Sequence, residues 1–525
     1  INLAIKNFGT DTLTSVNVRW VVNGIEQPLY TWTGALPSAQ CDTVTIGTFN
    51  FHEYTAHDLI YWTESPNSIP DSTSVNDTIH LTNVYPALSG LYTVGGVLPD
   101  FNLFSQLENA LGYGGILNDV TFSIRNGTYV SQLLIQNFPR LSMAHTVTFT
   151  SESGDSSLVK LTRNFTASNA NNFTVSFKDA HGIRFEKISL ASTKGRVLEL
   201  TEGSSNITVA HCHITGVDLL DNYSGYELIY SGTTSEDSIF IHHNRFENGG
   251  QGIYMIGSSG DKEKHHVFEY NGFYNNHSRA IYSKYTQHLQ VNNNTILNTT
   301  EAPDGIVVSY TSGNVEISRN DIRFMDGGTY GISIYASDGT ALLPIQLNNN
   351  YILSRNSTLT TYGIAQENCD YVKYNYNTIR IEDAGVNSIA FIDQGSNYNI
   401  HVRNCIFSNE SGGKAMSTSW SPYYTNNTVN YCNLYATGSV LAYFFNDYVD
   451  HQALQAGTNQ NLQGVSVESL FDGDGPDVLQ AALDGDAIPV SGLTTDIYGE
   501  ARNGATPDIG AREFTLPAHD VGAKL

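Results

Sequence analysis

The chain has 525 residues, and its 51 Asp and Glu against 26 Lys and Arg give a formal net charge of −25. That negative balance argues against binding to nucleic acid or to anionic membranes, since both attract basic surfaces. No apolar run approaches the roughly 18 residues of a membrane helix, so no membrane insertion is expected. Five cysteines are too few for a disulfide framework in a chain of this length.

The first segment, residues 1–88, alternates apolar and polar residues in short runs with turn signals between them. This pattern predicts a small β-sandwich. The phrase IKNFGTDTLTSVNVRWVVNG resembles the immunoglobulin-like adhesion modules that lie between domains of bacterial surface proteins. We therefore predict an immunoglobulin-like β-sandwich over residues 1–88.

A six-residue phrase, apolar–x–x–Asn–x–apolar, then recurs nine times between Val209 and Leu434. A repeat of 20–50 residues predicts stacked units that bury their apolar faces against each other. The repeats contain short strand-like runs and leave no room for a helix, so each one predicts a coil of a parallel β-helix. The fourth positions of the phrase, which are 27.5 residues apart on average, are Cys212, Asn244, Asn271, Asn294, Asn320, Asn350, Asn377, Cys405 and Cys432.

Asparagine suits a turn between strands because it tolerates left-handed backbone and bonds its own main chain. Stacked about 4.8 Å apart in successive coils, Asn amides also bond one another along the axis. Cysteine replaces Asn where the position is small and buried. We expect the three ladder cysteines to be buried free thiols, although Cys405 and Cys432 fall on adjacent coils, which leaves a disulfide open.

With this ladder, the chain resembles the secreted right-handed β-helix proteins of the pectin-lyase-like superfamily. Residues 91–130 look like the usual opening of such domains, where an amphipathic helix (about Phe101–Leu111, with Asp100 as N-cap) covers the open end of the solenoid. The predicted fold class is all-β: a right-handed parallel β-helix over residues 89–451 with an N-terminal capping helix, preceded by the immunoglobulin-like β-sandwich.

Residues 452–516 are acidic and rich in turns, and they are predicted to form a C-terminal cap of the β-helix. Their last part resembles the closing segment of β-helix domains in secreted Bacteroidetes proteins. The phrase LPAHDVGAKL resembles the opening strand of the same immunoglobulin-like module, so residues 517–525 are predicted to start a following sandwich. The chain is therefore interpreted as one unit of a tandem array, extracellular or on the cell surface, with neighbouring units of the same protein as partners.

Metal binding has weak support in the sequence. The stretch DGDGPD places Asp472, Asp474 and Asp477 as at the start of a calcium loop, but Pro476 and Leu483 break the helix-loop-helix pattern. No cofactor is required, and calcium is the one candidate ion. His211 and His213 have the spacing of one strand face, but no third ligand is specified.

Many relatives of this fold cleave acidic polysaccharides. In this chain histidines and basic residues gather over 242–288, which has the residue types that a lyase site needs but matches no family catalytic motif. A lyase needs a group that neutralises the substrate carboxylate and a base that takes its proton. The candidates for these roles are Lys284, Arg279, Arg245 and His266. A hydrolase needs paired carboxylates, but Asp218 with Asp221 and Glu236 with Asp237 do not fall on stacked strand registers.

The favoured interpretation is a structural or adhesive repeat unit of a long cell-surface or filament protein, with polysaccharide as a candidate ligand and no enzymatic activity. The alternative is a polysaccharide lyase, or another carbohydrate-active enzyme, that acts on acidic polysaccharide. The alternative rests on the basic and histidine-rich stretch over 242–288.

Overall fold

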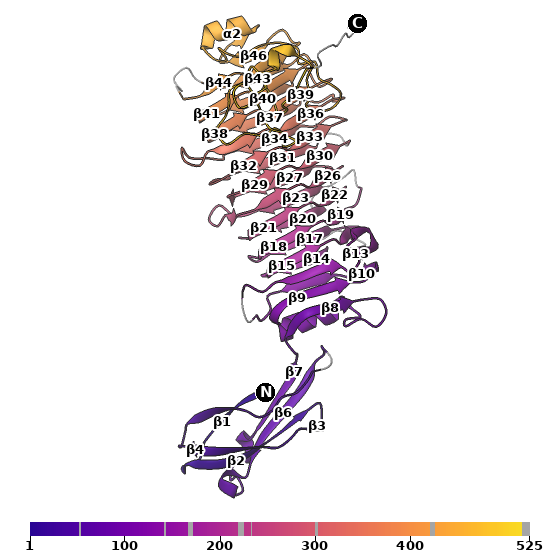
Figure 1. Cartoon of the computed structure of the whole chain (residues 1–525), viewed down its shortest axis with the longest axis vertical. Coiled ribbons are helices and arrows are strands. Elements are labelled where there is room, and N and C mark those ends of the chain that lie inside the picture. The colour runs from indigo at the N-terminus through magenta and orange to yellow at the C-terminus, as the bar shows by residue number, and fades with distance from the viewer. Residues whose placement is uncertain are drawn as a thin grey trace. The chain divides into compact units, whose positions relative to one another are not determined.

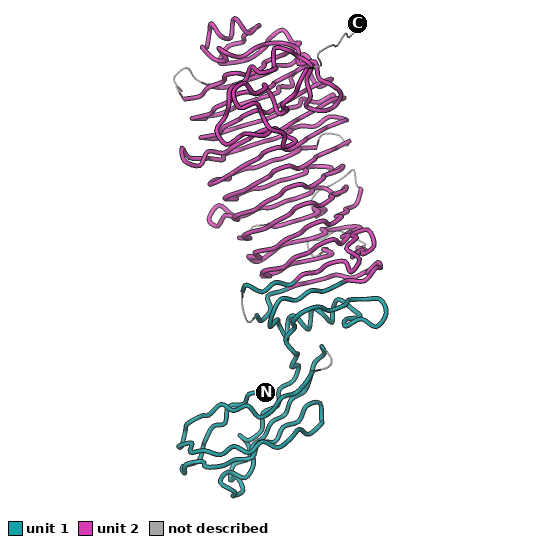
Figure 2. Tube along the Cα trace, viewed as in Figure 1, with its two compact units in different colours: residues 1–123, 136–147 teal, residues 124–135, 148–525 magenta. Residues whose placement is uncertain are grey.

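The computed structural model describes residues 1–51, 54–140, 143–165, 172–218, 225–232, 234–299, 303–420 and 426–516. The segment predicted to begin a following sandwich, 517–525, lies outside these residues. The chain divides into two compact units, residues 1–123 with 136–147 and residues 124–135 with 148–525 (Figure 2). Among the described residues, no helix is both long and apolar enough to span a membrane.

The N-terminal part of the first unit consists of two antiparallel sheets. One pairs β1 (Asn2–Lys6) with β5 (Cys41–Thr45), and the other joins β2 (Leu13–Val22), β3 (Ile25–Glu26), β4 (Tyr30–Leu36), β6 (His57–Glu64) and β7 (Thr78–Val84). Two short 3₁₀ turns, Pro66–Ser68 and Ser74–Asn76, precede β7. From Val16 to Val22 every second residue of β2 is buried, and Val18 and Trp20 pack in one core with Ile5 of the other sheet. The sheets thus form a small sandwich, while the immunoglobulin-like assignment stays a prediction.

The first unit continues into the opening of the solenoid. Strands β8 (Leu88–Val94) and β9 (Ile116–Ile124) flank α1 (Phe104–Asn109) and a π-helical turn, Ala110–Gly114. The helix begins three residues later than predicted, and Asp100 does not cap it. The Asp100 carboxylate instead accepts hydrogen bonds from the backbone and hydroxyl of Thr93, at 2.7 and 2.8 Å, and so holds the turn after β8.

The second unit is a parallel β-solenoid (Figure 1). The solenoid has about 12 turns, and 48% of the residues of the chain are in strands. This confirms the predicted all-β fold class. Each coil contributes one strand to each of three parallel sheets. Sheet one contains β10 (Gly127–Val130), β13 (Val159–Arg163), β16 (Ser189–Ser192), β19 (His213–Thr215), β22 (Arg245–Glu247), β26 (Gly272–Tyr274), β30 (Thr295–Asn298), β33 (Asp321–Phe324), β36 (Tyr351–Ser354), β39 (Thr378–Ile381), β42 (Ile406–Asn409) and β45 (Asn433–Ala436).

The other two sheets run beside it in the same coil order. Sheet two contains β11 (Leu133–Gln136), β14 (Phe173–Lys178), β17 (Arg196–Thr201), β20 (Glu227–Gly232), β23 (Gln251–Ile256), β27 (Arg279–Lys284), β31 (Asp304–Ser309), β34 (Tyr330–Tyr335), β37 (Tyr362–Glu367), β40 (Ile389–Gln394), β43 (Lys414–Thr418), β46 (Ala442–Phe444) and the antiparallel β47 (Asp447–Tyr448). Sheet three contains β12 (Val147–Ser151), β15 (His181–Glu186), β18 (Ser205–Ala210), β21 (Asp237–His242), β25 (Val267–Glu269), β29 (Gln290–Asn292), β32 (Glu316–Ser318), β35 (Ile345–Asn348), β38 (Asp370–Asn375), β41 (Tyr398–Arg403) and β44 (Thr428–Asn430), with β24 (Glu263–Lys264) and β28 (Thr286–Gln287) as a side branch.

The predicted ladder occupies the buried side of the turn from sheet three to sheet one. The Asn320 amide nitrogen donates to the Val291 carbonyl at 2.8 Å and to the Asn350 side-chain oxygen at 3.0 Å, and the same pattern recurs from Asn244 to Asn350. Cys405 and Cys432 are free, with the Cys405 backbone nitrogen donating to the Cys432 sulfur at 3.4 Å. The ladder extends one rung further than predicted, to Asn461.

A second polar ladder, which the sequence analysis missed, lies at the turn from sheet two to sheet three. The backbone nitrogen of Thr311 donates to the Ser337 hydroxyl at 3.0 Å, and that of Ser337 donates to the Cys369 sulfur at 3.4 Å. The Cys369 nitrogen donates in turn to the Asn397 side-chain oxygen at 2.6 Å. These rungs differ in residue type, so no repeated letter marks them in the sequence, and they account for the fourth buried cysteine.

The C-terminal segment runs along the solenoid. After α2 (His451–Thr458), which is N-capped by Asp450, the chain passes over the outer face of sheet one, where its yellow trace overlies the upper coils in Figure 1. The Ala511 nitrogen donates to the Thr378 hydroxyl at 2.8 Å, and the Arg380 guanidinium donates to the Gly473 carbonyl at 2.7 Å. A short 3₁₀ turn, Ala481–Leu483, lies within this segment.

Candidate functional site

The outer face of sheet two is a candidate binding surface. The C-terminal segment covers the outer face of sheet one over its upper coils. Strand register places one outward column of tyrosines, Tyr230, Tyr254 and Tyr282, on adjacent coils. The rings of Tyr230 and Tyr254 stack with centroids 5.5 Å apart, and that of Tyr282 is tilted by 39° against Tyr254 at 5.2 Å. The residues that precede Tyr254 and Tyr282 along their strands, Ile253 and Ile281, point inward and are fully buried.

Arginine and carboxylate side chains line a second outward column of the same sheet. Arg279, at the start of β27, is in register with Asp304 of β31, and its Nε donates to the Asp304 carboxylate at 3.1 Å. Burial is the largest influence on Asp304 and raises the pKa of its carboxyl, although the Arg279 charge opposes this. The Arg279 guanidinium also lies 4.7 Å from the centre of the Tyr282 ring.

Lys284 lies at the other end of β27, on the same outward face. Its ammonium is 5.0 Å from the ring centre of Tyr285 and 5.5 Å from that of Tyr310. These two rings stack at 4.7 Å on the turn that follows the strand. Among the described residues, no carboxylate lies within ion-pair distance of Lys284, so its positive charge is available to an anion in a strongly acidic chain. We define the sheet-two face as Tyr254, Arg279, Tyr282, Lys284 and Asp304.

The structure brings together only two of the four predicted lyase residues. Arg279 and Lys284 begin and end β27, five residues and therefore about 16 Å apart along the strand. Ala280 and Ile281 are both buried, which interrupts the alternation of the strand, and Arg279 packs over the ring of Tyr282 on the outer face. Arg245 lies on sheet one, where its guanidinium bonds Glu247 with Nε at 2.7 Å and packs over Tyr274. His266 has no exposed surface. A substrate on the sheet-two face cannot reach Arg245 or His266.

His266 belongs to a buried polar network that sequence reasoning missed. Its Nε2 lies 3.2 Å from the Glu263 carboxylate, and the Ser231 hydroxyl contacts both Glu263 and Glu236. Burial raises the pKa of each glutamate to about 7 and lowers that of His266 to about 4. All four side chains are closed off from solvent, so this network acts on stability and not on a substrate.

The predicted calcium ligands make other contacts. The Asp474 carboxylate accepts a hydrogen bond from Arg355 at 2.7 Å, and that of Asp477 accepts one from Arg512 at 2.9 Å. The Asp472 backbone closes the turn by donating to the Asp477 carbonyl at 2.9 Å. Within the described residues these carboxylates do not converge on a common point. Asp474 thus attaches the C-terminal segment to the solenoid, whereas the contacts of Asp472 and Asp477 lie within that segment.

Of the predicted acidic pairs, Asp221 lies outside the described residues. Asp218 accepts a hydrogen bond from His277 at 2.9 Å. Glu236 belongs to the buried network, whereas Asp237 faces outward, 2.8 Å from His265. Glu236 and Asp237 therefore do not act on one substrate.

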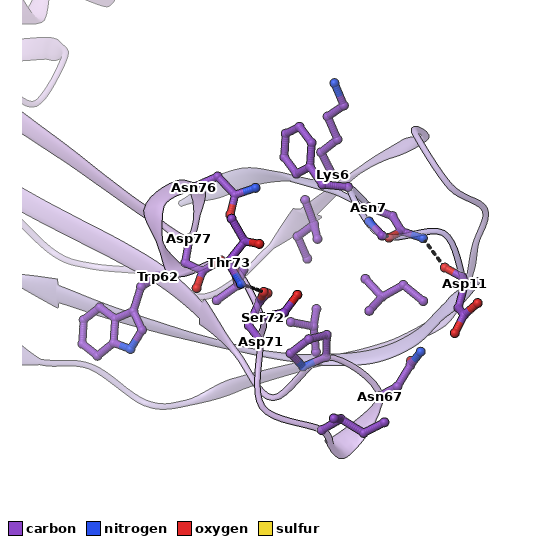
Figure 3. Close-up of a pocket in the computed structure, with 18 of the residues that line it drawn as sticks. Lys6, Asn7, Asp11, Trp62, Asn67, Asp71, Ser72, Thr73, Asn76 and Asp77 are labelled. Carbon is purple, nitrogen blue, oxygen red and sulfur yellow. Dashed lines mark hydrogen bonds between the residues drawn. The ribbon is translucent and has the colours of Figure 1, made fainter.

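A cavity of about 730 Å³ lies in the first unit, between β1 and the loop that leads to β7. Its floor includes Ile5 and Val16 of the sandwich core, and Asp11, Asp71 and Asp77 border it (Figure 3). Burial and the neighbouring Asp71 raise the pKa of Asp77. The cavity contains none of the predicted site residues.

Comparison with known proteins supports the fold. A family model described as "Right handed beta helix region" matches residues 222–352, which agrees with the predicted handedness. Among solved structures, the chain is similar to a GH136 lacto-N-biosidase from Eubacterium ramulus, with 9% identity, a TM-score of 0.40 and 67% of each chain covered. It is also similar to the PL6 family alginate lyase AlyGC, with 12% identity, a TM-score of 0.34, and 67% of this chain and 52% of that chain covered. No curated protein matches the chain in sequence.

The catalytic domain of a GH87 alpha-1,3-glucanase, solved with nigerose, is similar at 9% identity and a TM-score of 0.34, with 89% of this chain and 90% of that chain covered. These structures are carbohydrate-active enzymes, and they contradict our expectation that the chain has no enzymatic activity. Similarity at this level assigns no substrate or residue roles to this chain. The chain spans about half the length of the alginate lyase. The family model therefore supports a right-handed β-helix over residues 222–352, and the chemistry has to be argued from the chain's own residues.

Proposed function

We propose that the chain is a carbohydrate-active enzyme that cleaves an acidic polysaccharide bound along the sheet-two face. The observation that carries the proposal is the arrangement on β27, where Lys284 has no carboxylate partner within the described residues and Arg279 lies on the same outward side. Two cations about 16 Å apart match a polyanion better than a single small anion. The tyrosine rings between them offer apolar surface and hydroxyl groups to sugar rings.

The proposed reaction is β-elimination at a uronate residue. Arg279 neutralises the substrate carboxylate, which makes the neighbouring C–H more acidic. Asp304 takes that proton, since its raised pKa makes it a stronger base than an ordinary carboxylate once the substrate competes for Arg279. The C–O bond to the leaving sugar then breaks. Water supplies the proton to the leaving oxygen, and Asp304 then releases its proton to solvent, which balances the step.

The test is to incubate the chain with a panel of uronate-containing polysaccharides, with and without calcium, and to follow the absorbance of unsaturated sugar ends. Removing a general base costs about 10²- to 10⁴-fold in rate, so Asp304→Asn should lose at least 100-fold in kcat. Arg279→Ala should lower kcat and raise KM. Lys284→Ala should act mainly through KM, because Lys284 binds remote from the reacting atoms.

Asp321→Asn is the matched control. Asp321 pairs with Arg323 on sheet one, and its side chain is 16% exposed, against 15% for Asp304 in its pair with Arg279. The control should keep full activity. New reducing ends without unsaturated products would replace the lyase proposal by a hydrolase. Polysaccharide binding without any cleavage by the unsubstituted chain would overturn the enzymatic proposal.

A further inference from the structure

Three histidines gather at the turn from sheet three to sheet one. His211 and His243 occupy the same turn position on adjacent coils, and both have left-handed backbone, with φ of 54° and 55°. Because stacked coils repeat about every 4.8 Å, the two side chains leave the turn side by side. His242 ends β21 one residue earlier and extends from the outer face of sheet three.

The imidazoles already lie close to the spacing that a shared ion requires. The ligand atoms of all three lie within 4.8 Å of one another, and Nδ1 of His242 is 3.1 Å from Nδ1 of His243. Zinc–nitrogen bonds of about 2.0–2.1 Å place tetrahedral ligands roughly 3.4 Å apart. The rings therefore need to close by a little over 1 Å, which the exposed His211 and His243 and the half-buried His242 achieve by small rotations about their side-chain bonds.

The three histidines differ from the other histidines of this region in their partners. His213, His265, His266 and His277 each lie within 3.2 Å of a carboxylate. His288 accepts a hydrogen bond at Nδ1 from the Asn314 backbone nitrogen at 3.1 Å. Among the described residues, none of the three clustered histidines pairs with a carboxylate. Their contacts are with each other and with Tyr270, whose ring stacks on His243 at 4.9 Å.

The surrounding charges are compatible with a bound cation. Glu269 is in register with His242 on the next strand, so it adds one negative charge to the same face. Arg184, the nearest arginine on sheet three, is already paired with Glu186 at 2.7 Å. Lys187 occupies the same turn position as His211 on the preceding coil and adds one positive charge there.

We propose that His211, His242 and His243 form a binding site for a divalent transition-metal ion of the zinc, nickel or copper group. Imidazole nitrogen suits these ions, whereas calcium and magnesium prefer oxygen ligands. Sequence analysis paired His211 with His213, its neighbour along the strand. The second and third ligands, His242 and His243, instead come from the next coil, 31 and 32 residues after His211. Only the stacking of coils brings them close to His211. The site is independent of the proposed polysaccharide chemistry on sheet two.

The experiment is a titration of the whole chain with zinc chloride, followed by isothermal titration calorimetry and by competition with a chromophoric chelator. We expect one ion per chain, and at least tenfold weaker binding in His211→Ala and in His243→Ala. His265→Ala is the matched control, since His265 stacks on His288 with ring centroids 5.1 Å apart but lacks a third histidine. The control should bind zinc as the unsubstituted chain does.

Cobalt(II) gives a second readout, because tetrahedral coordination produces visible absorption bands that the unsubstituted chain should show and His243→Ala should lose. Zinc binding that is absent, or that falls equally in His265→Ala and His243→Ala, would overturn the proposal. Far-UV circular dichroism of each variant confirms that the coils are intact. His211 and His243 are exposed on a turn, so their substitution should weaken zinc binding without unfolding the chain.

Discussion

Stability against pH should reveal the buried network of Glu236, Glu263, Ser231 and His266. Burial raises the pKa of Glu236 from about 4.5 to about 7, so the folded state favours its protonated form. The folded chain therefore binds more protons than the unfolded chain between these values, and the contribution of this group is full below pH ~4.5 and is lost as pH rises to ~7. At about 1.4 kcal/mol per pKa unit, the loss is on the order of 3 kcal/mol.

Glu236→Gln removes this dependence, because Gln resembles the protonated glutamate and keeps a donor toward Glu263. The variant should be more stable than the unsubstituted chain at pH 8 by up to about 3 kcal/mol, and nearly equal to it at pH 4.5. Urea unfolding followed by far-UV circular dichroism at several pH values measures the difference. Burial lowers the pKa of His266, so His266 destabilises the fold in both proteins as pH falls below ~6.5, and the Glu236 charge opposes this lowering. The two proteins are therefore compared at pH 8, above this range, and at pH 4.5, where Glu236 in the folded chain is protonated.

Glu316→Gln on the outer face of sheet three is the control and should leave the pH profile unchanged. Parallel profiles for Glu236→Gln and the unsubstituted chain would refute the reasoning. Such a result would mean that the carboxyl is solvated in the folded state, against its zero exposure.

Three further predictions concern the solenoid. Asn320→Ala removes the donors and acceptor of one ladder rung and should cost roughly 3 kcal/mol by urea unfolding. Gly331→Ala places a Cβ 2.5 Å from the Gly363 carbonyl and should cost about 1–3 kcal/mol, whereas Gly260→Ala, with open space around it, should cost less than 1. Arg512→Ala leaves the buried Asp496 carboxylate without its 2.6 Å partner, and limited proteolysis should then cut the C-terminal segment selectively.

Several features followed from the sequence alone, because they depend on local periodicity. The recurrence of Asn at one turn position predicted a parallel β-helix, and the ladder bonds from Asn244 to Asn350 confirm that every predicted rung in this stretch is stacked. The three ladder cysteines were predicted as Asn substitutes and are buried and free. Asn461 was missed since it follows a helix and lacks the flanking apolar phrase.

The functional interpretation failed where it depended on the outer faces. The sequence alone favoured a protein without enzymatic activity, since its candidate residues matched no motif, and the comparisons with solved structures contradict this. The outer residues vary from coil to coil because only inward positions are constrained by packing. The repeat therefore does not predict which chemical groups the outward positions carry.

Only the tertiary structure decided which outward side chains meet. Arg279 pairs with Asp304, and His211 meets His242 and His243, across one coil each. Steps between rungs range from 23 to 32 residues, so the sequence does not give the register of residues outside the ladder. The parallel strands fix that register through backbone hydrogen bonds, and a shift of one residue turns a side chain from the outer face to the core. The sequence thus determines that coils stack, while the pairing of strands determines which groups share a face.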